Sequence, residues 1–160
     1  MRYLGFGLIL AVAYILMRRE RTSADEEIKF LSELGALFRH IERRVSAYFE
    51  SPREWAASFS ARDERISLAL ANIRRGVDPS SALLDAVRGE KSRHGADGEL
   101  LKCISMLGAD ELVCERESII RANSLLDEYI SKESARLTER ARIRSALIAL
   151  ISLGAVIILI

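Results

Sequence analysis

The sequence has few of the residue types from which catalytic and metal sites are built. Among 160 residues there are two cysteines and two histidines. The histidines, His40 and His94, lie in different parts of the chain, and no cysteine lies near either of them, so we predict no metal site at either histidine. The glycine-rich loops that bind nucleotides and the serine elbow of hydrolases are absent too. These absences predict a protein that is not an enzyme, with no catalytic residue, metal, cofactor or small-molecule substrate.

An excess of one charge is also missing. Lysine and arginine number 24 against 23 aspartates and glutamates, which leaves a net charge of +1. This balance predicts no nucleic-acid partner. The two cysteines, Cys103 and Cys114, lie in a charge-rich stretch typical of a reducing compartment. We expect both to be small buried hydrophobic residues, and a disulfide is possible only if the chain folds back between them near Gly108.

No stretch alternates apolar and polar residues as a half-buried strand does, so the sequence predicts an all-α fold. One long helix is expected to continue directly from the apolar N-terminal segment, because apolar residues recur every three to four positions there. They are Ile28, Leu31, Leu34, Phe38, Ile41, Val45 and Phe49.

Start and stop signals divide the middle of the chain into short helices. Ser51 and Pro52, with Glu54 in a capping box, open one helix, and Asp78-Pro79 opens another. Further signals are Gly76 at a helix end, an exposed loop over 88–98, a cap at Asp97 and a second end at Gly108. A last helix of about 50 residues, or about 75 Å, is expected from Asp110 onward, antiparallel to the first.

The apolar residues are concentrated at the two ends. Tyr3–Met17 and Ser145–Ile160 are both uncharged. The first run reaches about 22 Å, short of the roughly 30 Å hydrocarbon core, and snorkelling arginines can supply the difference. We therefore predict transmembrane helices over 1–18 and 145–160, with a helical bundle domain over 19–144 between them.

Each apolar run has a rival interpretation. Ala11-Val12-Ala13 fits a signal-peptide cleavage pattern, but it lies inside the apolar run and the basic region before it is Arg2 alone. We favour an uncleaved anchor. The C-terminal run can also be interpreted as a buried core helix. That interpretation is less favoured, because a second apolar run lies at the other end of the chain.

Arginines flank both apolar runs on the side of the central segment. Positive flanks stay in the cytosol, so the central domain is expected to be cytosolic and the arginines to contact anionic lipid. The topology-setting residues are Arg18, Arg19, Arg21, Arg140, Arg142 and Arg144.

Several features have both a binding and a structural interpretation. Small residues one turn apart, Gly7 with Ala11 and Ser145 with Ala149, permit close helix contact in lipid. Trp55 and Phe59 form either part of the core or an aromatic patch that docks a partner protein. Two arginine clusters can bind phosphate or form solvated helix faces, and the solvated interpretation is favoured. They are Arg39 with Arg43-Arg44, and Arg74-Arg75.

The order of these segments resembles the stage III sporulation protein AB family of endospore-forming bacteria, over nearly the whole chain. The residues that carry the resemblance are Ser51-Pro52, Leu107-Gly108 followed by Ile119, and Leu153-Gly154 before the terminal apolar residues. After the Leu-Gly step the family usually has Asp and then Gln, and this chain has Glu111 and Glu115. The resemblance implies that partner contacts lie near these two residues.

That family is similar to the cytoplasmic domain of type II secretion platform proteins, a helical bundle beside a secretion ATPase. The resemblance implies a subunit of the mother-cell membrane during sporulation. It would help to assemble a secretion-like channel complex that links mother cell and forespore. Its partners would be membrane lipid, a separate secretion-type ATPase and other membrane subunits. The alternative is a membrane-anchored platform or regulatory subunit of another secretion or signalling complex.

Overall fold

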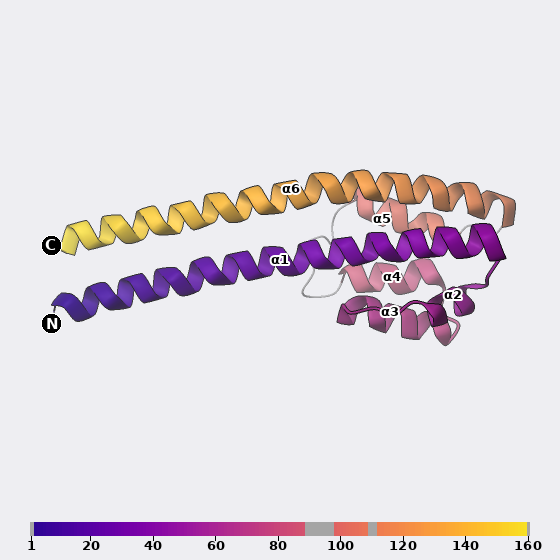
Figure 1. Cartoon of the computed structure of the whole chain (residues 1–160), viewed down its shortest axis with the longest axis horizontal. Coiled ribbons are helices and arrows are strands. Elements are labelled where there is room, and N and C mark those ends of the chain that lie inside the picture. The colour runs from indigo at the N-terminus through magenta and orange to yellow at the C-terminus, as the bar shows by residue number, and fades with distance from the viewer. Residues whose placement is uncertain (1, 89–97, 109–111, 160) are drawn as a thin grey trace. The chain divides into compact units, whose positions relative to one another are not determined.

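The regular elements of the described chain are all helices, which confirms the all-α prediction (Figure 1). The computed structural model describes residues 2–88, 98–108 and 112–159. The helices are α1 (Arg2–Tyr48), α2 (Pro52–Ser58), α3 (Glu64–Arg74), α4 (Pro79–Arg88), α5 (Gly98–Ser105), the short 3-10 helix η1 (Met106–Gly108) and α6 (Leu112–Leu159).

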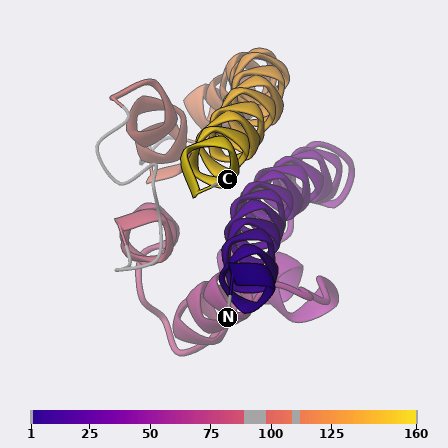
Figure 2. The ribbon, with the colours of Figure 1, turned by 90° about the vertical axis from the view of Figure 1, so that its left-hand side faces the viewer.

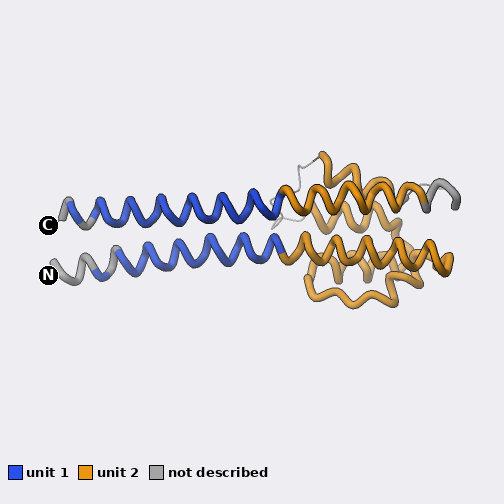
Figure 3. The backbone as a smooth tube through the Cα atoms, turned by 45° about the horizontal axis from the view of Figure 1, so that its top comes forward, with its two compact units in different colours: residues 1–28, 133–160 blue, residues 29–132 orange. Residues whose placement is uncertain are grey.

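The chain divides into two compact units, coloured separately in Figure 3. Unit 1 comprises 1–28 and 133–160, and unit 2 comprises 29–132. Within the described residues, none of the helices combines the length and the apolar character that a membrane crossing requires. The transmembrane helices expected over 1–18 and 145–160 are therefore not supported by the described helices.

In unit 2, α1 and α6 are antiparallel neighbours. The guanidinium of Arg39 donates to the Asp127 carboxylate at 2.7 Å, and the Asn123 amide donates to the Glu42 carboxylate. As residue numbers rise along α1, those of the partners on α6 fall, which is the order that antiparallel helices require. The expected antiparallel pairing of the first and last helices is therefore present within this unit.

The core of unit 2 is built from one face of α1, one face of α6 and the inward faces of the shorter helices. Phe30 and Phe38 of α1 are fully buried, and Trp55 of α2 is 3% exposed. Burying such side chains is the main stabilising term available to helices too short to be stable alone. Other fully buried members are Leu31, Leu34, Leu37, Ile41, Ile66, Leu70, Ile73, Leu83, Leu100 and Ile104.

Local signals set the helix ends as the sequence predicts. The Glu54 carboxylate accepts hydrogen bonds from the backbone N–H and the hydroxyl of Ser51, at 2.7 and 2.8 Å. Gly76 has φ +96°, the left-handed conformation that a helix end of this type needs. The loop expected over 88–98 and the Asp97 cap fall largely outside the described residues.

One core prediction was wrong. Phe49 continues the apolar spacing of α1, but α1 ends at Tyr48 and Phe49 is 80% exposed. Its φ is +52°, in the left-handed region that most residues with a Cβ avoid. Phe49 thus belongs to the turn that reverses the chain toward Ser51. The turn exposes its side chain, although the spacing predicts it on the apolar face of the helix.

Gly35 of α1 lies close to α6 in unit 2. A Cβ built at this position would lie 2.8 Å from Cδ1 of Ile130, the flexible end of that side chain. We expect Gly35→Ala to change the free energy of unfolding by less than about 1 kcal/mol, because the gain in helix propensity offsets a small shift of Ile130. Gly35→Leu is expected to destabilise by about 1–3 kcal/mol through overpacking. Urea unfolding of both variants tests this, and equal stabilities would contradict the close packing.

Candidate functional site

The two helical segments of unit 1 lie side by side (Figures 1 and 2). An ion pair between Arg144 and Glu20 joins them at 3.0 Å. The buried residues of unit 1 include small and apolar side chains and two carboxylates. They are Ala13, Ala24, Glu27, Glu133, Leu137 and Ser145. The expected small-residue contacts were only partly right: Ser145 is buried, but Ala11 and Ala149 are exposed and Gly7 has open space around it.

Large apolar side chains cover the outside of unit 1. Leu150 is 64% exposed and Ile151 is 71% exposed on α6, and Ile15 is 61% exposed on α1. Large numbers of exposed apolar side chains are unusual in a monomer in water and are typical of surfaces that contact lipid or another protein. We call this set the apolar surface of unit 1. It comprises Leu10, Val12, Tyr14, Ile15, Leu16, Ile143, Leu147, Leu150, Ile151, Leu153 and Ile157.

All six topology-setting arginines are exposed beside this apolar surface. They are Arg18, Arg19, Arg21, Arg140, Arg142 and Arg144. Arg144 is held by Glu20, whereas the other five form no ion pair with another described residue. Unit 1 therefore carries unneutralised positive charge beside exposed apolar side chains.

A groove of about 270 Å³ lies between the two segments of unit 1. Its lining residues are Arg21, Ala24, Asp25 and Ile28 from α1, with Thr138, Ala141 and Arg142 from α6. The two arginines come from different helices. The sequence offered no signal for this groove, because it requires the pairing of segments more than a hundred residues apart.

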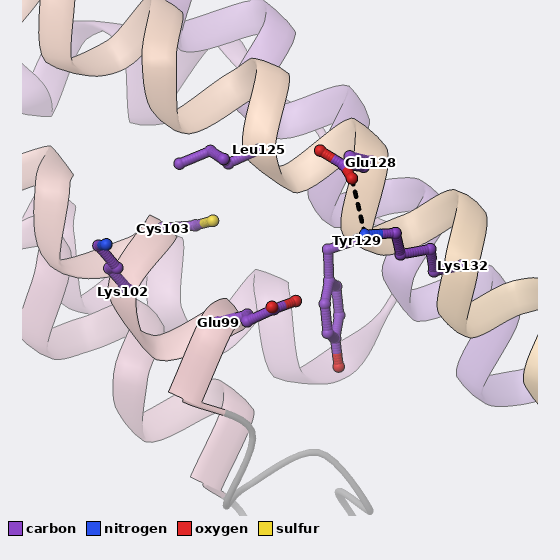
Figure 4. A pocket seen from close by; sticks show the side chains of 7 residues that line it. All are labelled: Glu99, Lys102, Cys103, Leu125, Glu128, Tyr129 and Lys132. Atoms are coloured by element: carbon purple, nitrogen blue, oxygen red, sulfur yellow. Dashed lines mark ion pairs between the residues drawn. The ribbon is translucent and has the colours of Figure 1, made fainter.

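Unit 2 has a smaller pocket of about 160 Å³ between α5 and α6 (Figure 4). Lys132 and Glu128 form an ion pair at 2.6 Å on its rim, and their hydrogen bond lowers the pKa of Glu128 and raises that of Lys132. Cys103 lines the pocket as a free thiol, and burial raises its pKa. A protonated thiol is a poorer nucleophile than a thiolate, so burial makes Cys103 less reactive than an exposed cysteine.

His40 lies close to a serine, but the pair is structural. Its Nε2 is 2.9 Å from the Ser58 hydroxyl, and the ring lies 5.3 Å from that of Phe59. The Ser58 hydroxyl donates to the Trp55 carbonyl at 3.0 Å, so its proton is engaged in a hydrogen bond at the end of α2. Burial lowers the pKa of His40, which keeps the ring neutral at pH 7. His94 lies outside the described residues.

Of the residues predicted to bind partners, the structure describes the side chains of Trp55 and Phe59. Trp55 is 3% exposed and belongs to the core, which matches the core interpretation and not the exposed docking patch. Phe59 is half-buried against His40. Glu111 lies outside the described residues, and Glu115 lies in α6 with its side chain outside those described. A partner-binding role for Phe59, Glu111 and Glu115 stays a prediction.

The arginine clusters have roles that the sequence did not reveal. Arg74 donates through Nε and Nη2 to the Ala56 carbonyl at 3.0 and 2.8 Å, which satisfies the end of α2. Arg39 binds Asp127 of α6. Neither side chain is a free phosphate ligand, and neither forms only a solvated face. Both contacts are long-range, so no local pattern could have predicted them.

The Asp63 carboxylate makes the stability of unit 2 depend on pH. Burial alone would raise the pKa of this carboxyl, but hydrogen bonds and charge from Arg65 outweigh burial and hold the pKa below its ordinary value. The stabilisation is therefore fully present above the unfolded pKa, about 3.9, and is lost as pH falls through the folded pKa. Asp63 also caps α3 by accepting from the Arg65 N–H at 2.8 Å.

We expect Asp63→Asn to lower the free energy of unfolding at pH 7 by about 1 kcal/mol and to change it less at pH 3. Urea unfolding at the two pH values measures both effects. Asp85→Asn is the control, because Asp85 is exposed on α4 and caps no helix. An equal loss at both pH values would contradict the assigned charge interaction.

Comparisons with protein-family models, with curated proteins and with solved structures find no match to this chain. Among the residues that the structure describes, no group of three or more histidine, cysteine or acidic side chains is placed to hold a metal ion. The candidate functional site is therefore the apolar surface of unit 1 with its flanking arginines and groove.

Proposed function

We propose that this chain is a non-enzymatic assembly subunit of a cell membrane, with 1–18 and 145–160 as its lipid-contacting segments and 19–144 on the cytosolic side. The observation that carries the proposal is the exposed apolar surface of unit 1. Side chains such as Leu150 and Ile151 are 64% and 71% exposed, and burying each in lipid would contribute about 1.5–3 kcal/mol. Unpaired arginines beside them match the anionic headgroup layer.

The resemblance to the stage III sporulation protein AB family supplies the biological part of the proposal. By that likeness the chain would belong to the mother-cell membrane and help to assemble a secretion-like channel complex toward the forespore. A separate secretion-type ATPase and other membrane subunits would be its partners. Unit 2 would present the protein-binding surface, while unit 1 would hold it at the lipid.

The side chains of unit 2 best placed for such a partner are at the end of α1. Tyr48 is 66% exposed and Phe49 is 80% exposed, and the guanidinium of Arg44 lies 5.7 Å from the Tyr48 ring. Aromatic residues are enriched in the buried centres of protein interfaces, and tyrosine is among the residues that contribute most to binding there. In this proposal Tyr48 and Phe49 replace the buried Trp55 as the aromatic contact.

A truncation tests the division of labour between the units. Deleting 145–160 is expected to weaken membrane association, because only 1–18 is left to contact lipid, and to disrupt assembly with the ATPase. Unit 2 is expected to keep its helical circular dichroism and its cooperative thermal unfolding. Pull-down of the ATPase from detergent extracts measures the first effect. The full-length chain with Phe49→Ala is the companion variant, expected to stay in the membrane and lose the ATPase. Loss of helicity in the truncated chain would contradict the proposal.

A further inference from the structure

The groove of unit 1 combines apolar walls with arginines from two helices. Ala24 forms a buried part of the seam between the segments, and Ile28 and Ala141 supply further apolar lining. Arg21 of α1 and Arg142 of α6 supply the positive charge. With a volume of about 270 Å³, the groove has room for a small polar group and the first atoms of an attached chain.

The charges of the groove favour an anion. Neither Arg21 nor Arg142 forms an ion pair with another described residue, whereas Arg144, two residues away, is bound to Glu20 at 3.0 Å. A guanidinium presents planar, paired N–H donors that fit phosphate oxygens. The Asp25 carboxylate also lines the groove and would repel an anion. Together the two arginines and Asp25 give the groove a local charge of one positive unit.

Thr138 contributes little to anion binding. Its hydroxyl donates to the Ser134 carbonyl at 2.8 Å, so its proton is already engaged. The two arginines are therefore the donors that the groove offers to a phosphate group.

We propose that this groove binds the phosphate group of a membrane phospholipid. Arg21 lies four residues after the apolar run that ends at Met17, and Arg142 lies three residues before the one that begins at Ser145, so the groove begins about one helical turn from the apolar surface of unit 1. A phosphate between the arginines would let the acyl chains lie on that surface. The inference rests on the proposed membrane function and names the ligand of that surface.

Native mass spectrometry of the full-length chain in detergent micelles tests the site. The chain is titrated with short-chain phosphatidylglycerol, with diacylglycerol of the same chain length, and with inorganic phosphate. We expect a single saturable adduct with phosphatidylglycerol alone. Diacylglycerol lacks the phosphate, and inorganic phosphate lacks the acyl chains that add apolar contact.

Two double variants, each lacking two arginines, show where the lipid binds. Arg21→Gln with Arg142→Gln is expected to weaken phosphatidylglycerol binding about thirtyfold, since each arginine near a headgroup contributes a few-fold in affinity. Arg18→Gln with Arg140→Gln removes the same charge from exposed arginines outside the groove and should weaken binding less than about threefold. Asp25→Asn is expected to strengthen binding, because it removes the opposing carboxylate.

A variant that keeps every charge separates shape from electrostatics. Ala141→Leu fills part of the groove and is expected to reduce the adduct while Arg21 and Arg142 remain. Equal losses in the two double variants would show a diffuse charge effect and overturn the proposal. Displacement of the lipid by inorganic phosphate alone would assign the site to free phosphate and overturn it too. Failure of the wild-type chain to associate with vesicles would instead contradict the proposed membrane function.

Discussion

Replacing Leu150 with lysine is expected to release most of the chain from lipid vesicles. Leu150 is 64% exposed within the apolar surface of unit 1, so the substitution costs little in the folded protein in water. In the apolar part of a bilayer a lysine costs about 2.5–3.5 kcal/mol, and the lost leucine contact adds to that. The partition coefficient of the chain between vesicles and buffer should therefore fall about a hundredfold. Flotation in a sucrose gradient measures the partition.

Leu68→Lys is the matched control for this change. Leu68 is also 64% exposed, but it lies on α3 of unit 2. The two substitutions add the same charge and remove the same exposed side chain, so they differ only in the unit that carries them. If Leu68→Lys released the chain as strongly as Leu150→Lys, lipid contact would not be specific to unit 1.

The second large effect concerns the core of unit 2. Phe38→Ala is expected to destabilise the chain by about 3–5 kcal/mol, because the phenyl ring is fully buried and its removal leaves a cavity that the neighbouring helices cannot fill. Most small domains have about 5–15 kcal/mol of stability in total, so much of it would be lost. Urea unfolding followed by circular dichroism measures the change.

Phe49→Ala provides the comparison within the same helical repeat. Phe49 is 80% exposed and its backbone is in the left-handed region, so truncating its side chain should change stability by less than about 0.5 kcal/mol. Phe49→Gly is expected to stabilise slightly, since glycine adopts this conformation without strain. A large loss of stability in Phe49→Ala would mean that its ring is packed against the core after all.

The helices and several of their ends were predictable because their signals are local. Ser51, Pro52 and Glu54 lie within one turn of the chain, and the Ser51 backbone N–H donates to the Glu54 carboxylate as the capping pattern requires. Gly76 ends α3 for an equally local reason, its positive φ. The periodic apolar residues from Leu31 to Ile41 predicted the buried face of α1 in the same way.

What the sequence could not show depends on contacts between distant segments. Arg74 reaches the end of α2 and Arg39 reaches α6, and neither partner is close in sequence. Trp55 is buried because α2 lies on the other helices, although its spacing from Phe59 fits an exposed patch equally well. The groove of unit 1 forms for the same reason, through pairing of α1 with α6. Local periodicity cannot decide any of these.

The measurement that tests the central claim most directly is the distribution of the intact wild-type chain between membrane and buffer after an alkaline wash. If acyl chains solvate the exposed leucines and isoleucines of unit 1, the chain is expected to be recovered with the membranes. It is also expected to float with vesicles once detergent is removed. A soluble monomer in detergent-free supernatant would contradict the account, since those side chains would then be stable in water.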